Sequence, residues 1–166
     1  SRAMLDSAMA EHAQESGAEY VLGARVLQVT VDESSAVGRA HLNGQEAEFQ
    51  GKTVVIASGF GSKLPESLGL GRCSDFAMGA QAEVESCGVE EVEVYLGGET
   101  APGFFGWVVP ISEGKALVGL LSRRRTGFYL RRFLAGLAEQ GRIADEASRI
   151  HFGGVPLRPA RRSYAD

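Results

Sequence analysis

A short glycine-containing turn follows a continuous β-branched run and carries residue types that could contact a phosphate. The run is 53–57, and the turn contains Gly59, Gly61 and Ser62. Glycines at the end of a strand let backbone amides approach a phosphate closely. A complete dinucleotide fingerprint would need a third glycine where Leu64 stands. Two interpretations remain open: a sharp turn leaving a sheet, and a secondary contact to a cofactor held mainly elsewhere.

Three aromatic side chains are concentrated in the segment 102–110, which begins and ends with proline. Large rings on a rigid backbone can form a preformed apolar wall for a hydrophobic substrate or a flavin ring. Ordinary core packing is the alternative, but the kink of a Pro-Gly-Phe sequence favours a binding wall. Phe105 and Trp107 should share one face of a strand. The candidate binding residues are Pro102, Gly103, Phe104, Phe105, Trp107 and Pro110.

Other reactive side chains are scattered and form no recognisable catalytic set. The three histidines lack the spacing of metal ligands, and the two cysteines form no Cys-x-x-Cys pair, so we expect no metal and two free thiols in a reducing compartment. An enzyme of this sequence would take its reactive group from a cofactor. The isolated candidates are Cys73, Asp75, Glu83 and Tyr95.

Charge is distributed unevenly along the chain. Residues 1–114 hold 6 basic and 17 acidic residues, a balance of −11, whereas residues 115–166 hold 11 and 4, a balance of +7. The two parts should attract each other through internal salt bridges; the alternative for the basic part is an anionic cofactor or lipid headgroup. The acidic total disfavours nucleic acid. The arginines concerned are Arg123, Arg124, Arg125, Arg131, Arg132, Arg158, Arg161 and Arg162.

The first part of the chain predicts a helix, a small meander and one buried strand. A helix up to Gly17 carries one apolar face, which includes Leu5 and Met9 and needs something to lie on. Short strands follow at 20–22, 25–31, 36–42 and 45–49, and Asn43-Gly44 is a strong hairpin signal. The β-branched run 53–57 is typical of a parallel strand buried on both faces.

The rest of the chain predicts an antiparallel sheet backed by a helix. After a connection at 63–72, strand patterns recur at 78–85, 91–96, 106–109 and 116–121. A helix with apolar residues from Leu130 to Ala138 follows and ends at Gly141. His151-Phe152 could add a last strand, and the glycine-proline segment 153–159 that follows is a candidate linker between lobes. The predicted class is therefore α+β.

Several motifs, in order, resemble those of geranylgeranyl-reductase-type flavoproteins, within the p-hydroxybenzoate-hydroxylase-like superfamily. The segment 102–110 resembles the family's Pro-x-(Tyr/Phe)-x-Trp-x-x-Pro motif. The helix from Arg2 to Gly17-Ala18, the turn Ala57–Ser62 and the segment Gly153–Pro156 match further family motifs. The turn departs from the family at Ser58, where an aspartate is usual, and this leaves the polar role of that position open.

The resemblance implies FAD as cofactor, with Arg2, Gly59, Gly61 and Ser62 as contacts. It assigns 1–62 to part of an FAD-binding domain, 63–72 to a connection, 73–157 to the substrate domain and 158–166 to the return into the FAD-binding domain. The family's main FAD-binding motifs would lie before Ser1 and after Asp166. We therefore expect an internal fragment of a longer protein, inactive by itself, that does not bind FAD tightly.

The resemblance also implies a reductase of isoprenoid or other hydrophobic substrates, with the aromatic segment lining the substrate tunnel. An aromatic monooxygenase or halogenase on the same scaffold is the alternative enzyme, and a non-catalytic module that binds a hydrophobic ligand is the alternative of another class. No run of apolar residues is long enough to cross a bilayer. We expect a cytoplasmic protein with peripheral membrane contact, whose uncovered apolar surface could promote self-association.

Overall fold

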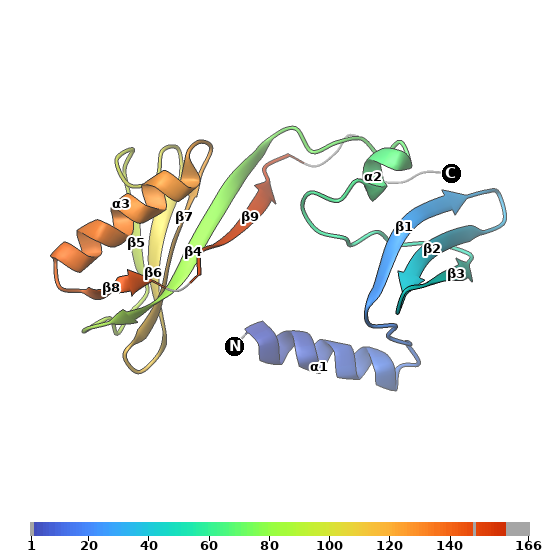
Figure 1. Ribbon diagram of the computed structural model, residues 1–166, viewed down its shortest axis with the longest axis horizontal. Coiled ribbons are helices and arrows are strands. Elements are labelled where there is room, and N and C mark those ends of the chain that lie inside the picture. Colours follow the sequence, from blue (N-terminus) through green and yellow to red (C-terminus); the bar gives the residue numbers. More distant parts are fainter. Residues whose placement is uncertain (1, 148, 159–166) are drawn as a thin grey trace.

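The computed structural model describes residues 2–147 and 149–158, which form two lobes along the long axis of the molecule (Figure 1). The small lobe contains α1 (Arg2–Glu15), β1 (Ala24–Val31), β2 (Ala36–Leu42), β3 (Gln45–Gly51) and α2 (Leu64–Ser67). The large lobe contains the remaining elements. These are β4 (Phe76–Ser86), β5 (Glu93–Leu96), β6 (Phe105–Ser112), β7 (Lys115–Ser122), α3 (Thr126–Glu139), β8 (Ile143–Ala147) and β9 (His151–Pro156).

The small sheet is the predicted meander. Its order is β1-β2-β3, and both pairings are antiparallel. Asn43 (φ 52°) and Gly44 (φ 83°) form the tight turn between β2 and β3, as their positive-φ preference predicts. The strand predicted at 20–22 is wrong, because residues 20 and 21 form no regular element and residue 22 lies in the turn that precedes β1.

The large sheet is antiparallel, as the strand spacing predicts. Its order is β5-β6-β7-β4-β8, and β9 also pairs with β4. The long β4 therefore has two partners along one edge, β9 beside residues 76–81 and β8 beside residues 84–86. The short strand β8 and the single-turn helix α2 were not predicted from the sequence. β4 and β9 are the strands that lead toward the small lobe (Figure 1).

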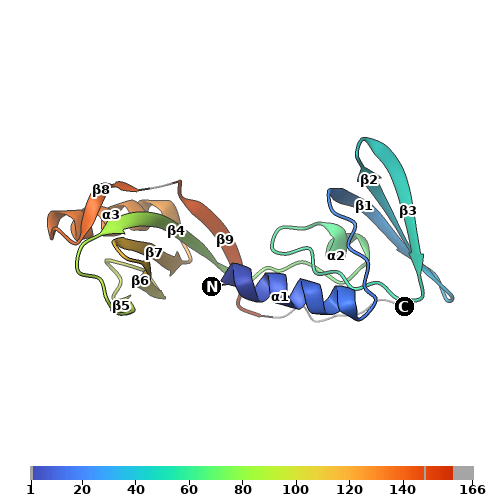
Figure 2. The ribbon, with the colours of Figure 1, turned by 90° about the horizontal axis from the view of Figure 1, so that it is seen from below.

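Helix α3 covers one face of the large sheet, and the main core lies between them (Figure 2). Leu130 and Leu137 of α3 pack with Val108, Val118 and Leu120 of the sheet, and all five are at most 2% exposed. Gly141 (φ 70°) ends the helix, and the N–H of Arg142 donates to the carbonyl of Leu137. The prediction of a helix-backed antiparallel sheet is confirmed.

The buried parallel strand predicted at 53–57 is wrong for the described structure. These residues form no strand, all except Ile56 are exposed, and Val55 is 85% exposed. A parallel strand requires neighbours that accept and donate its backbone hydrogen bonds and layers that cover both faces. Among the described residues, none pairs with this run, so its β-branched composition alone does not produce a strand.

Helix α1 forms as predicted and ends at Gly17 (φ 93°), but its apolar face is uncovered. Met4, Leu5 and Met9 are 72%, 59% and 66% exposed, and no described residue of the helix is buried. The expectation that this face lies on another element is therefore not met by the described part of the chain.

Ion pairs join the acidic part of the chain to the basic part, as the charge distribution predicts. Each of five pairs links a carboxylate before residue 114 to a cation after it. Arg161 and Arg162 lie outside the described residues, as does most of the segment 158–166. The pairs are Glu83–Lys115, Asp75–Arg123, Glu99–Arg132, Glu93–Arg142 and Asp75–Arg158.

Candidate functional site

The aromatic segment enters β6 through a tight turn. Gly103 (φ 81°) lies within this turn, and the N–H of Phe104 donates to the carbonyl of the buried Ala101 at 3.0 Å. Phe105 and Trp107 then lie on one face of β6, with ring centroids 6.0 Å apart. By the alternation of the strand, Gly106, Val108 and Pro110 face α3 instead. The structure thus brings Phe105 and Trp107 together and places Pro110 on the opposite face.

The face of the large sheet opposite α3 carries apolar side chains on three adjacent strands, which we call the open-face wall. Register places Val94 of β5 beside Trp107 and Leu96 beside Phe105. On the other side of β6, Val109 pairs with Leu117. Alternation along β5 and β7 was the signal that could have identified the aliphatic members from the sequence. The wall consists of Val94, Leu96, Phe105, Trp107, Val109, Leu117 and Leu121.

Trp107 lies directly over Gly119, its register partner on β7. A Cβ atom added at position 119 would overlap the six-membered and pyrrole parts of the indole ring. Gly119 is not among the residues with positive φ, so close approach of the ring, rather than backbone conformation, requires glycine here. The absence of a side chain at position 119 thus lets the indole ring lie close against the backbone of β7.

Phe104 lies beside Arg123, the residue that follows the end of β7. The Arg123 guanidinium lies 6.0 Å from the centre of its ring, a cation–π arrangement. The same guanidinium donates to Asp75 Oδ1 at 2.7 Å, and Arg158 approaches Asp75 Oδ2 at 3.3 Å. Asp75, one of the isolated candidates, lies just before β4, and its carboxylate therefore links this point to the segments that follow β7 and β9.

The predicted cofactor contacts lie in the small lobe and its connection. Gly59 (φ 74°) and Gly61 (φ 89°) are exposed, with open space where a side chain would be. Ser62 Oγ accepts the N–H of Leu64 at 3.3 Å. Arg2 forms an ion pair with Asp6 of its own helix, at 3.1 Å between Nε and Oδ1.

These residues fit an FAD phosphate only in part. The open glycine turn leaves room for backbone amides to approach an anion, but the described residues do not enclose a dinucleotide.

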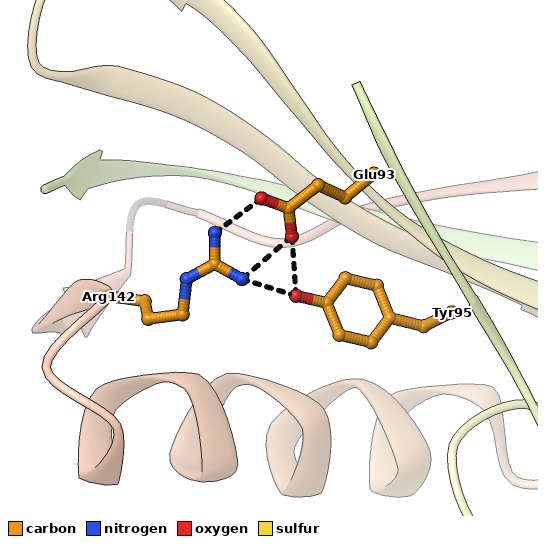
Figure 3. Close-up of polar contacts among 3 residues, drawn as sticks. All are labelled: Glu93, Tyr95 and Arg142. Carbon is orange, nitrogen blue, oxygen red and sulfur yellow. Dashed lines mark hydrogen bonds and ion pairs between the residues drawn. The ribbon is translucent and has the colours of Figure 1, made fainter. Parts of the chain in front are cut away.

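The edge strand β5 is joined to the segment after α3 by polar contacts of Tyr95 and Arg142 (Figure 3). Tyr95 is one of the isolated candidates, whereas Arg142 was not predicted from the sequence. Arg142 forms a bidentate pair with Glu93, and its Nη1 also donates to the Tyr95 hydroxyl at 2.7 Å. That hydroxyl donates to Glu93 Oε2 at 2.6 Å, and the Tyr95 ring packs against Phe133 at 4.8 Å. We call Glu93, Tyr95 and Arg142 the β5 clamp. It positions the strand whose other face contributes Val94 and Leu96 to the wall.

Because of the β5 clamp, the free energy of unfolding should decrease at acidic pH. The hydrogen bond from Arg142, followed by that from Tyr95, lowers the pKa of Glu93 from its ordinary 4.5 to about 2. A carboxyl with a lowered folded-state pKa stabilises the fold fully above about pH 4.5, and this contribution disappears as pH falls toward 2. For this partly exposed pair we expect about 1–2 kcal/mol. Urea unfolding across this range measures the loss, and Glu93→Gln should remove most of the pH dependence that the clamp contributes.

The other isolated candidates have structural partners. Lys115 Nζ donates to Glu83 Oε1 at 2.8 Å, and the Cys73 thiol donates to the Asp75 carbonyl at 3.6 Å. No group of three metal-ligating side chains occurs among the described residues, and no helix in that part of the chain is long and apolar enough to span a membrane. The described residues thus combine an apolar sheet face with side chains whose polar partners are structural.

Comparison with known sequences places the chain beside isoprenoid lipid reductases. It is 32% identical over 171 residues to a digeranylgeranylglycerophospholipid reductase of Methanosarcina acetivorans, covering 94% of this chain and 41% of that protein. A second such reductase, from Methanothermobacter thermautotrophicus, is 32% identical over 181 residues, covering 99% and 45%. The chain thus spans less than half the length of these relatives. No family model matches it.

Comparison with solved structures shows the same fold in flavoproteins. A geranylgeranyl bacteriochlorophyll reductase-like protein of Thermoplasma acidophilum superimposes with a TM-score of 0.77 at 22% identity, covering 93% of this chain and 42% of that one. A flavin-dependent halogenase superimposes with a TM-score of 0.65 at 16% identity, covering 91% and 30%. The chain is thus similar in sequence to digeranylgeranylglycerophospholipid reductases, of whose length it spans about two fifths, and it shares its fold with these solved structures.

Proposed function

We propose that this chain is part of an FAD-dependent reductase that saturates isoprenoid double bonds, and that its large lobe binds the lipid chain. Similarity to digeranylgeranylglycerophospholipid reductases over 94% of the chain is the observation that carries the proposal. In this proposal residues 73–157 are the substrate domain, and residues 1–62 belong to the FAD-binding domain.

The open-face wall has the chemistry that an isoprenoid substrate requires. Branched aliphatic and aromatic side chains on three adjacent strands offer an apolar surface to methyl-branched hydrocarbon, and a ligand on that surface is removed from water. Several of these side chains are exposed in the described structure: Leu96 by 77%, Val94 by 58% and Phe105 by 39%. Their burial on binding would contribute affinity in proportion to the apolar area covered.

When bound, reduced FAD supplies the hydride for the reaction. The chain's own residues would hold the double bond in position against the wall and exclude water, and the amides of Gly59 and Gly61 with the Ser62 hydroxyl would contact the dinucleotide. For this chain by itself we expect no tight FAD binding, because the open turn is only a partial site. Saturable tight binding in a fluorescence titration would contradict that expectation.

The test uses the longer protein of which, in this proposal, the chain is a part. Supplied with a chemical reductant and a geranylgeranyl glycerophospholipid under anaerobic conditions, it should add two hydrogen atoms per reduced double bond, as measured by mass spectrometry. Trp107→Ala should lower kcat/KM by about tenfold or more through loss of the wall's largest ring. Phe49→Ala, which removes a 41% exposed ring from the small sheet, is the matched control.

Three other outcomes separate the alternatives. Oxygen-dependent hydroxylation or halogenation of an aromatic compound would replace the reductase by a monooxygenase or halogenase. Binding of the lipid without any reduction, in a protein that holds no flavin, would favour a non-catalytic module. Unchanged lipid turnover in Trp107→Ala would show that the open-face wall is not part of the substrate site.

Peripheral contact with an anionic membrane is a further part of this proposal. Arg124, Arg125 and Arg131 are exposed around the N-terminal end of α3, and the Arg125 guanidinium lies 4.2 Å from the ring centre of the 44% exposed Phe128. Such basic and aromatic side chains suit a phospholipid surface. Flotation with anionic and zwitterionic vesicles tests it, since equal binding to both would contradict the electrostatic role.

A further inference from the structure

The glycine turn 59–62 and the glycine pair of β9, far apart in the sequence, contact each other. The ring of Phe60, which lies between Gly59 and Gly61, packs against Gly154 of β9 so closely that a Cβ atom there would overlap it. The same ring lies 5.0 Å from that of Phe76 on β4, at an interplanar angle of 59°. We call Phe60, Phe76 and Gly154 the Phe60 clasp.

The register of the large sheet explains why these residues meet. Phe76 pairs with Pro156 and Met78 pairs with Gly154, so Phe76 and Gly154 are diagonal neighbours on one face. Gly154 is not among the residues with positive φ, so its backbone would accept alanine. Glycine is needed there because the ring of Phe60 occupies the space of a side chain.

The clasp lies where the two lobes are joined. β4 and β9 lead from the large sheet toward the small lobe, and Phe60 belongs to the connection that comes from the small lobe (Figure 1). Next to it, the N–H of Leu157 donates to the Asp75 carbonyl at 2.9 Å, while Arg123 and Arg158 both approach the Asp75 carboxylate. The glycine turn is therefore tied to the base of the large sheet, on the face that α3 covers, while the open-face wall lies on the opposite face of the same sheet.

We propose that Phe60 is a positioning residue: through Gly154 and Phe76 it holds the turn 59–62 at a fixed place relative to the open-face wall. This inference rests on the proposed function, in which the turn contacts the cofactor and the wall contacts the lipid. A shift of about 1 Å between the reacting groups is enough to slow a reaction greatly while binding persists. Phe60 is thus expected to affect turnover more than substrate affinity.

The contact itself is tested in this chain by NMR. The Cα protons of Gly154 lie against the face or edge of the Phe60 ring, so ring current should displace their resonances from ordinary glycine values. Phe60→Ala should return them to ordinary values, and Phe49→Ala, with a ring of similar exposure elsewhere, should not. Unchanged Gly154 resonances in Phe60→Ala would overturn the clasp.

The positioning role is tested by kinetics in the longer protein. Phe60→Ala should lower kcat for lipid reduction by about tenfold, with flavin retained and KM for the lipid changed less than about twofold. Phe60→Leu should recover part of the loss, and Gly154→Ala, which displaces the ring, should reproduce it. Because both act on one contact, the double variant Phe60→Ala with Gly154→Ala should be no slower than either single variant.

Each contrary result has a distinct meaning. Loss of flavin, a rise in KM alone or additive losses in the double variant would overturn the positioning role. If the unaltered longer protein reduces no isoprenoid lipid, the proposed function fails, whereas the Gly154 resonances decide the clasp independently.

Discussion

Leu130→Ala is expected to destabilise the large lobe by about 3 kcal/mol, within the usual range for a leucine truncated in a packed core. Leu130 is 0% exposed and lies in α3 against the sheet, among Leu120, Phe133 and other core residues. Truncation would remove the transfer free energy of the lost methyl groups and leave a cavity that the surrounding strands can fill only in part. Urea unfolding followed by the fluorescence of Trp107 measures the change.

The matched control is Leu5→Ala in α1. Leu5 is 59% exposed, and its helix buries no described residue, so the same truncation should change stability by less than about 0.5 kcal/mol. Equal losses in both variants would show that α1 is covered as tightly as α3 in solution. A small loss in Leu130→Ala would show that α3 does not form the main core with the sheet.

These two helices illustrate what sequence periodicity can predict. In both, the apolar spacing and the terminal glycine predicted the helix and its end correctly. Periodicity also identifies the apolar face, but it does not say which other element covers that face. For α3 the cover is the adjacent antiparallel sheet; for α1 the described residues supply none.

The wrong prediction of a strand at 53–57 has the same cause, namely that the sequence of a segment does not identify its partner. Its β-branched residues have strand propensity, but a strand exists through hydrogen bonds to a neighbour, and that neighbour cannot be read from the run itself. By contrast, Asn43-Gly44 encodes a hairpin locally, since both residues accept positive φ and the partner strands are adjacent in sequence. Features encoded by neighbouring residues were therefore predicted correctly, whereas features that require a partner far away in the sequence were not.

In the candidate site, too, contacts within one strand could be predicted from the sequence, and contacts between distant segments could not. Alternation within one strand was enough to predict that Phe105 and Trp107 share a face. The contact of Phe60 with Gly154 joins residues far apart in the chain, and no pattern of spacing encodes it. The β5 clamp likewise depends on Arg142, whose position after Gly141 gave no sign that it would meet Glu93.

Gly119→Ala is expected to destabilise the large lobe by about 1–3 kcal/mol, because a new Cβ would overlap the Trp107 indole. The ring would have to leave its place on the sheet, so its emission should also shift to the red as water reaches it. Gly98→Ala is the matched control: position 98 has open space for a Cβ and no positive φ. Its stability should change by less than about 0.5 kcal/mol.

A variant without the Trp107 indole decides whether overlap with this ring causes the loss of stability in Gly119→Ala. In a Trp107→Ala background, Gly119→Ala should cost little or even stabilise, because the overlap is gone and alanine restricts the unfolded chain more than glycine does. Far-UV circular dichroism during urea unfolding replaces tryptophan fluorescence as the probe in this background. If Gly119→Ala still lowers stability in this background, the cause lies in the backbone of β7 and not in the ring. A cost that disappears would show that position 119 must be glycine to make room for the Trp107 ring, and hence that the place of this ring in the wall is specified by a glycine on the neighbouring strand.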